Sequence, residues 1–222
     1  MDPSFVLILA MAAMGIAIAV VLLIVAPRVR GLGLQRELEA AGVRIGRGAE
    51  GRDESAGTGV KVLRVLVVPV PAKDFQQAFL QAASGIRGAQ PQMVSERVIA
   101  LAGRKLRFWN PNRPNPLDFA KAEVAFDVLT PVETRLVVRV DFAGYWRAVV
   151  SVGLFILWGS FIVWITFRPR LSPWPAITIF VGVGISLLAI RYTAQLQSTR
   201  NFFDQLALQA VRRAVEIMRR PQ

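Results

Sequence analysis

The sequence predicts an α-helical membrane protein with three spans and a small α+β domain whose sheet is mostly antiparallel. Three stretches without Asp, Glu, Lys or Arg predict the spans: Phe5 to Ala26, Ala148 to Phe167 and Leu171 to Ile190. A helix rises about 1.5 Å per residue, so about 20 apolar residues cross the roughly 30 Å hydrocarbon core. Alternating strand-like segments between residues 60 and 142 predict the sheet. A buried core helix is the alternative for each stretch, and three stretches of spanning length favour the membrane.

The first stretch is expected to be an N-terminal transmembrane anchor over residues 1–26. A cleaved secretory signal is the alternative, but Met1 to Ser4 contains no Lys or Arg. The stretch also lacks a polar segment with small residues before Pro27, and a cleavage site needs such a segment. An uncleaved anchor is therefore favoured.

The other two stretches are expected to form a transmembrane helical hairpin over residues 147–192. Charged and amphipathic aromatic residues bracket both stretches at the levels where a chain leaves the hydrocarbon. The predicted interface anchors are Trp146, Arg147, Arg168, Arg170, Trp174, Arg191 and Tyr192. Most Lys and Arg residues close to the span ends lie on the side of residues 27–147 and of the C-terminal tail. This bias predicts a multi-pass protein of the cell inner (plasma) membrane, with the N-terminus outside and the main domain and C-terminus cytoplasmic.

Residues 27–59 have the composition of a flexible linker, since glycines lie there among Arg, Glu, Asp and Ser. A short helix around Leu34 to Ala41 is expected inside this range. A phosphate-binding loop is the alternative for its glycine-rich part. The order G-x-x-x-x-G-K-[ST] is absent, however, so the linker interpretation is favoured.

Residues 60–146 are expected to form the cytoplasmic α+β domain with the order β-α-β-β-β-β. The apolar run from Val60 to Val68 predicts a central strand, and Phe75 to Ala83 has helical spacing, with Gly85 expected to end the helix at positive φ. Four further strands are predicted at residues 93–102, 105–109, 121–129 and 134–142, the first two joined at Gly103.

Acidic and basic residues alternate with apolar ones on the last two predicted strands. Glu123 and Asp127 share one face of the first, and Arg135, Arg139 and Asp141 share one face of the second. Opposite charges on neighbouring strands are most often cross-strand pairs on a solvated face. We therefore favour such pairs over a catalytic carboxylate pair.

Two places are candidate partner-binding sites. Trp109 and Phe119 flank a proline-rich loop that is able to present a binding surface, the alternative being a hairpin connection whose aromatic rings lie in the core. Residues 193–222 have the spacing of an amphipathic helix, with Phe203 and Leu206 on its apolar face. This helix is able to lie in the lipid interface, pack on the domain or pair with another chain.

The composition excludes much enzyme chemistry. The chain has no Cys and no His, which removes Ser-His-Asp and Cys-His nucleophiles, Cys/His zinc sites and an axial His for a haem. No catalytic residue, metal ligand or cofactor is therefore predicted. The net charge of +12 makes a bilayer with anionic headgroups the expected partner, and no motif supports nucleic acid.

Two functions follow as hypotheses. The first is a non-catalytic integral inner-membrane protein, an accessory subunit or scaffold whose α+β domain binds a partner protein or an anionic lipid surface, with a membrane protein or a second copy as candidate partner. The alternative is a membrane-anchored lipid-handling protein or enzyme with an apolar ligand pocket between the sheet and the helix around Phe75. A filled core between that helix and the sheet favours the first hypothesis, and a cavity there favours the second.

Overall fold

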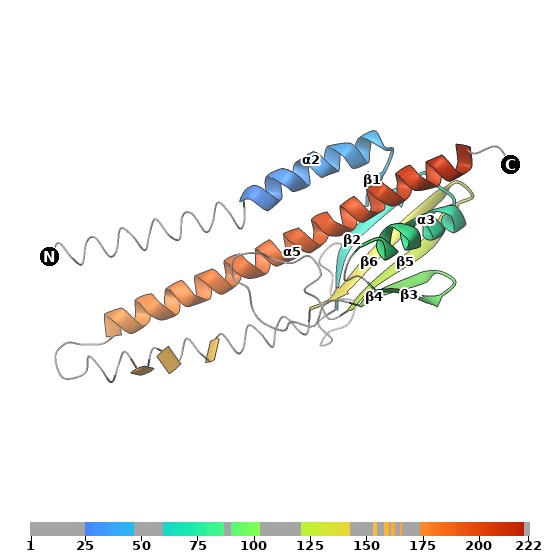
Figure 1. Cartoon of the computed structure of the whole chain (residues 1–222). Coiled ribbons are helices and arrows are strands. Elements are labelled where there is room, and N and C mark those ends of the chain that lie inside the picture. Colours follow the sequence, from blue (N-terminus) through green and yellow to red (C-terminus); the bar gives the residue numbers. More distant parts are fainter. Residues whose placement is uncertain are drawn as a thin grey trace. The chain divides into compact units, whose positions relative to one another are not determined.

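The computed structural model describes residues 25–46, 60–86, 90–102, 121–142 and 174–219, with isolated positions between 153 and 165. The described helices and strands are, in chain order, α2 (Ala26–Ala40), β1 (Arg44–Ile45), β2 (Val60–Val68), α3 (Ala72–Ser84), β3 (Gln90–Ser95), β4 (Val98–Ala102), β5 (Lys121–Thr130), β6 (Glu133–Asp141) and α5 (Trp174–Arg219) (Figure 1). The chain divides into two compact units: residues 1–29 with 146–194 form unit 1, and residues 30–145 with 195–222 form unit 2. The whole sheet and α3 belong to unit 2.

Within the part of the chain that the structure describes, no helix has both the length and the apolarity needed to cross a membrane. This finding overturns the predicted three-span fold, the multi-pass inner-membrane location and both functions that were built on membrane spans. The predicted first span lies outside the described residues except for its last two, and the predicted second span is described only at isolated positions. The third lies mostly within α5. This helix is 46 residues long in total and continues past the predicted span into a segment with charged side chains. An uncharged run signals that its side chains avoid water, but it does not say what covers them.

The strands form one antiparallel sheet with the order β1-β2-β6-β5-β4-β3. Four of its five strand pairs join strands that are consecutive in the sequence, and short hairpin turns connect β3 to β4 and β5 to β6. The central pair, β2 and β6, joins segments that are far apart in the sequence, with Val65 opposite Val137. The antiparallel α+β part of the predicted fold is thus present, with one strand more than expected.

Alternation along β5 and β6 separates the two faces of the sheet. Val124 and Phe126 lie opposite Val138 and Leu136, and all four side chains are buried on one face. On the other face Glu123 lies opposite Arg139, and Asp127 lies opposite Arg135. The predicted cross-strand charge pairing therefore agrees with the register of these strands.

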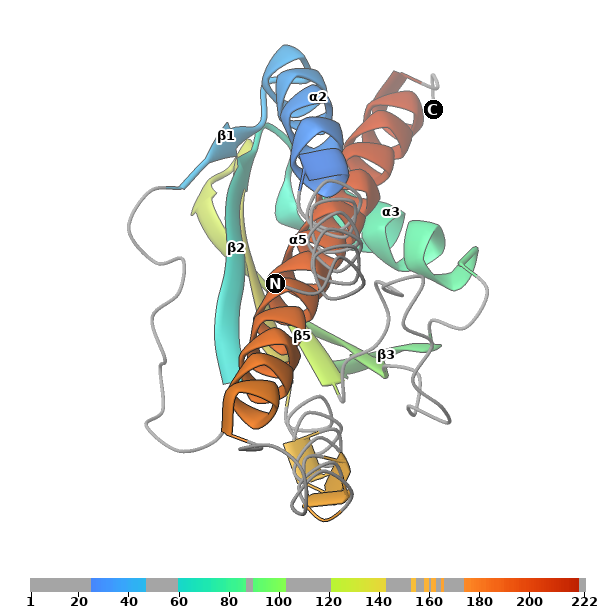
Figure 2. The same cartoon turned by 90° about the vertical axis from the view of Figure 1, so that its left-hand side faces the viewer.

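Helix α3 and the part of α5 that belongs to unit 2 cover the same face of the sheet (Figure 2). Helix α3 places the rings of Phe75 and Phe79 against Phe126 of β5, with ring centroids 5.8 and 5.5 Å from that ring and edge-to-face geometry. All three rings are buried. They occupy the space between helix and sheet where the lipid-pocket hypothesis required a cavity.

The part of α5 that belongs to unit 2 supplies much of the remaining core. Apolar side chains recur along it at spacings of three and four residues, as a helix packed on a sheet requires. The buried members are Phe203, Leu206, Ala207, Leu208, Ala210, Val211 and Ala214. The helix is continuous through residue 192, where the sequence predicted a boundary between a span and a separate amphipathic helix.

Helix α2 includes most of the short helix expected around Leu34 to Ala41 and begins earlier, at Ala26, in a range expected to be linker, and it contacts α5. A Cβ added at Gly31 would lie 2.8 Å from Nε2 of Gln197, so glycine allows the two helices to approach closely there. Six residues further along α2, Glu37 accepts a 3.2 Å hydrogen bond from Arg212 of α5. The two contacts hold α2 beside α5 within unit 2.

A glycine in the left-handed region ends α2. Gly42 has φ of 76°, its amide donates to the Glu39 carbonyl, and the next amide, that of Val43, donates to the Leu38 carbonyl. This is the Schellman pattern, and it is completed by the apolar side chains of Val43 and Leu38, both of which are buried. The cap turns the chain from α2 into β1.

Replacing Gly42 by alanine is expected to lower the free energy of unfolding by about 1–2 kcal/mol, since a residue with a Cβ is strained in this conformation. The new Cβ would also lie 3.2 Å from Pro69. Urea unfolding followed by circular dichroism measures the change. Gly33→Ala is the matched control, because a Cβ at Gly33 meets nothing within 4 Å and alanine favours a helix. Equal stabilities for the two variants would contradict the prediction.

Two local predictions were wrong. The turn after β3 lies at Glu96 and Arg97, whereas the predicted turn was at Gly103. Residues 93–102 therefore belong to two strands, β3 and β4, and not to one. Gly85 follows α3 with φ of −72°, which is ordinary right-handed backbone and not the predicted positive φ. The predicted strand at 105–109 lies outside the described residues.

Candidate functional site

Most of the predicted interface and partner residues fall where the structure describes little. Six lie outside the described residues: Trp109, Phe119, Trp146, Arg147, Arg168 and Arg170. Trp174, Arg191 and Tyr192 belong to α5, and Tyr192 is half-buried. Within the described residues these positions are not brought together into one site.

Phe203 and Leu206, the predicted partner-binding residues of the C-terminal helix, are core residues of unit 2. The side chains are 0% and 1% exposed, and the Phe203 ring meets Phe202 edge-on at a centroid distance of 5.3 Å. Of the three arrangements open to this helix, the structure has the one in which it packs on the chain's own domain. Neither residue therefore offers a surface to a partner.

The described residues contain no group of three or more His, Cys, Asp or Glu side chains placed to hold a metal ion. An open hollow of about 400 Å³ lies beside the end of α2, lined by residues 35 and 39 and by the turn from Gly42 to Ile45. Because one short stretch of chain lines it and it is wide open, this hollow does not exclude water as an active site does.

One buried ion pair joins distant parts of the chain. Nε and Nη2 of Arg64 on β2 donate to Oδ1 and Oδ2 of Asp204 on α5, both at 2.9 Å. The side chains are 8% and 2% exposed. The sequence offered a signal that the prediction did not use, since Arg64 interrupts the apolar run of β2 and Asp204 lies among the apolar residues of α5.

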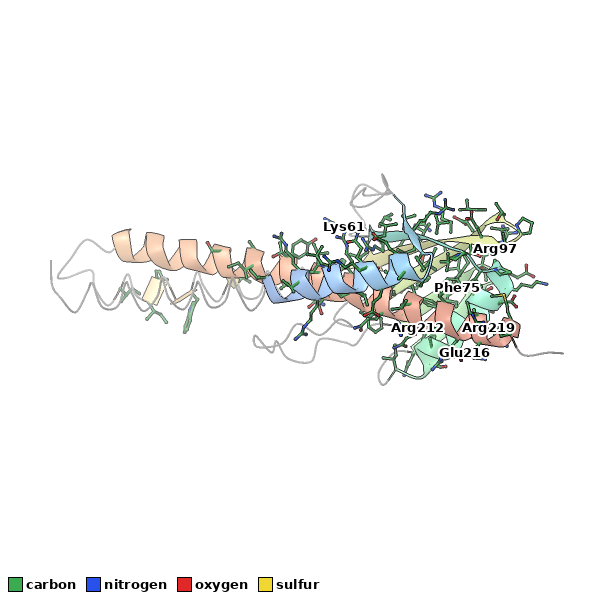
Figure 3. All side chains as sticks on the ribbon, turned by 90° about the horizontal axis from the view of Figure 1, so that it is seen from above. Lys61, Phe75, Arg97, Arg212, Glu216 and Arg219 are labelled. Atoms are coloured by element: carbon green, nitrogen blue, oxygen red, sulfur yellow. The ribbon has the colours of Figure 1, made fainter. Side chains whose placement is uncertain are left out.

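The last turns of α5 project beyond the part of the helix that is buried. Burial ends at Ala214, and every residue from Glu216 to Arg219 is exposed. The exposed fractions of Ile217 and Met218 are 39% and 47%. Figure 3 shows Arg212, Glu216 and Arg219 along these turns.

Two arginines flank the exposed apolar residues along the helix, and the exposed Glu216 lies between the arginines in sequence. Arg213 precedes Ile217 by one helical turn, and Arg219 follows Met218 directly. Neither arginine makes an ion pair with another described residue, whereas Arg212 pairs with Glu37 of α2. We call Arg213, Ile217, Met218 and Arg219 the α5 tip. The part of α2 in unit 2 adds exposed Arg30, Leu32 and Arg36 to the same helix pair.

A second group of exposed apolar residues lies at the two hairpin turns of the sheet. Met93 and Val94 are exposed near the β3–β4 turn, and Val128, Leu129 and Val132 are exposed around the β5–β6 turn. Exposed apolar side chains on neighbouring loops are typical of protein contact surfaces. These residues carry no charge that would identify an occupant.

No protein-family model, no curated protein and no solved structure matches this chain.

Proposed function

We propose that this chain is a non-catalytic protein that binds reversibly to anionic lipid surfaces through the α5 tip. The observation that supports this function is the exposure of Ile217 and Met218 between two arginines that make no ion pair with another described residue. Helices that lie on a bilayer surface combine apolar side chains, which enter the headgroup region, with Lys and Arg, which attract anionic lipid. The α5 tip has both groups within two helical turns.

The chemistry of the tip favours lipid over the other anionic surfaces. Nucleic acid would use the arginines as phosphate contacts and leave Ile217 and Met218 exposed to water. A bilayer accommodates both groups at once, because its anionic headgroups lie directly over an apolar interior. The net charge of +12 over the whole chain increases the long-range attraction to such a surface.

Vesicle binding by the purified full-length chain tests the proposal. We expect binding to vesicles that contain phosphatidylglycerol, little binding to phosphatidylcholine alone, and weaker binding as salt is raised. Each arginine near an anionic leaflet contributes about 1 kcal/mol, so Arg213→Ala with Arg219→Ala should weaken binding roughly 30-fold. Ile217→Ser with Met218→Ser should also weaken binding to the phosphatidylglycerol vesicles, because the apolar side chains no longer enter the headgroup region.

The matched control removes two exposed cations elsewhere in unit 2, with Lys73→Ala and Arg97→Ala. This pair has the same change in net charge, so it should retain binding within about threefold if the tip is the contact. An equal loss in both double variants would mean that net charge alone attracts the chain, and it would refute the α5 tip as the site. Absence of binding to phosphatidylglycerol vesicles would refute the function itself.

A further inference from the structure

The turn of the β5–β6 hairpin carries three aliphatic side chains that are exposed to solvent. They are Val128, Leu129 and Val132, and their exposed fractions lie between 48% and 63%. We call these three residues the hairpin tip. Apolar side chains that gather at one exposed turn mark a contact with another molecule or with a membrane.

The hairpin tip projects beyond the neighbouring hairpin. The Phe126 amide of β5 donates to the Arg97 carbonyl of the β3–β4 turn at 2.8 Å, and β5 continues from there to Thr130. At about 3.4 Å per residue, the chain from Phe126 to Thr130 adds roughly 13 Å. A flat surface that approaches along the strand direction therefore meets the β5–β6 turn before it meets the β3–β4 turn.

The end of α2 and the β5–β6 turn lie at the same end of the sheet. Val68, the last residue of β2, lies opposite Thr134 of β6, which follows the turn directly. The cap of α2 lies beside the same end of β2, since a Cβ added at Gly42 would be 3.2 Å from Pro69. The cap thus marks the end of the sheet at which the hairpin tip projects.

The α5 tip lies at this end as well. Arg212, which immediately precedes the α5 tip, donates to Glu37 in the last turn of α2 at 3.2 Å. Figure 1 shows the last turns of α5 and the turn between β5 and β6 at one end of unit 2. The two exposed apolar groups are therefore presented by different elements in the same direction.

The backbone of the β5–β6 turn suits surroundings with little water. Pro131 has no amide hydrogen, and the Val132 amide donates to Oγ1 of Thr130 at 3.4 Å. An amide that leaves water without a hydrogen-bond partner is unfavourable. Neither position of this turn has such an amide, so the cost of moving the turn out of water is reduced.

The two acidic side chains beside the turn each have a basic neighbour. Glu133 accepts a hydrogen bond from Arg44, and Asp127 lies opposite Arg135 in the strand register. The two arginines offset the repulsion between these carboxylates and an anionic surface, because attraction and repulsion act over the same short range. The approach of the hairpin tip to anionic lipid is therefore not opposed by a net negative charge at the turn.

We propose that the hairpin tip is a second lipid contact, which places Val128, Leu129 and Val132 among the headgroups of the surface that the α5 tip binds. This inference rests on the proposed function, because the position of the hairpin tip at the same end as the α5 tip identifies lipid as its occupant. A single helix end leaves unit 2 free to rotate about one point. Two contacts on separate elements fix its orientation on the bilayer, with the end of the sheet toward the lipid.

An environment-sensitive fluorophore on single cysteines tests the inference. The chain has no cysteine, so Val132→Cys, Met218→Cys and Glu96→Cys each provide one site for the fluorophore NBD, in the hairpin tip, the α5 tip and the β3–β4 turn. All three positions are exposed. With phosphatidylglycerol vesicles we expect NBD fluorescence to rise and shift to shorter wavelength at residues 132 and 218. It should change little at residue 96, the matched control, which lies in the turn that is set back.

A pair of substitutions in the hairpin tip measures its contribution to affinity. Leu129→Ser with Val132→Ser should weaken binding to the same vesicles about tenfold, because two aliphatic side chains no longer leave water. Met93→Ser with Val94→Ser removes two exposed apolar residues from the neighbouring hairpin and should retain binding within about twofold. Circular dichroism checks that both variants fold. Equal losses of binding in the two variants would overturn the hairpin contact.

The possible results separate this inference from the proposed function. A fluorescence change at residue 218 without one at residue 132 would overturn the hairpin contact and leave lipid binding by the α5 tip intact. A change at residue 132 alone would support the hairpin contact and refute the α5 tip. Absence of vesicle binding would overturn both. A change at residue 132 that follows protein concentration without vesicles would identify a second copy of the chain as the occupant, and it would also overturn the inference.

Discussion

Replacing Asp204 by alanine is expected to lower the free energy of unfolding by about 3–5 kcal/mol. The substitution leaves the guanidinium of Arg64 buried without its carboxylate, because that side chain is only 8% exposed. The cost is that of an uncompensated charge and exceeds the net contribution of the pair itself. Urea unfolding, with hydrogen exchange of the β2 and β6 amides as a second readout, measures the loss.

Asp127→Ala is the matched control for this prediction. Asp127 is also a carboxylate opposite an arginine, since it pairs in register with Arg135, but it lies exposed on the other face of the sheet. Exposed pairs of this kind contribute up to about 1 kcal/mol. If Asp204→Ala lowers the free energy of unfolding no more than Asp127→Ala does, other groups in the core stabilise the charge of Arg64, and the prediction is contradicted.

Phe203→Ala is expected to destabilise the chain by about 3–5 kcal/mol, as for other fully buried aromatic residues. The sequence alone suggested that this ring binds a partner, in which case its removal would weaken association and leave the fold intact. In the structure the ring is 0% exposed, so its removal opens a cavity between α5 and the sheet. Thermal and urea unfolding of the full-length variant distinguish the two interpretations.

Phe202 provides the comparison, since it is the same residue type in the next position and is half-buried. Phe202→Ala should cost less than half as much, because less of its surface leaves water on folding. A stable Phe203→Ala chain with altered oligomeric state would restore the partner-binding interpretation and contradict the packing described here.

The strands were predictable wherever alternation was regular. β2 occupies residues 60–68 as the apolar run indicated, and β5 and β6 lie within one residue of the predicted bounds. Two-residue periodicity reports local geometry, and the position of Glu123 opposite Arg139 follows from it once the hairpin forms. Helix α3 was likewise visible from the spacing of Phe75 and Phe79.

Features that depend on distant contacts were not predictable in the same way. Arg64 and Asp204 are each a charged residue within an apolar segment. The sequence does not reveal that the two side chains form an ion pair with each other. The part of α2 before Leu34 was taken for linker, because contacts such as that of Gly31 with α5 are not revealed by its own composition. The prediction of membrane spans was wrong for a related reason. An uncharged segment indicates that its side chains are shielded from water, but it does not indicate whether lipid or protein shields them.

The distance along the chain between β2 and α5 has a consequence for synthesis. The helix that covers the buried face of β2 is made another 140 residues later, which is the separation of Arg64 from Asp204. At about 5–20 residues per second this interval is roughly 7–28 s. During that time the nascent sheet exposes the apolar face that α5 will cover. Arg64 also lacks its partner, because Asp204 has not yet been synthesised. Unit 2 therefore completes its core only after the α5 residues have been made, and premature termination before residue 204 would yield a chain that chaperones must recognise or proteases remove.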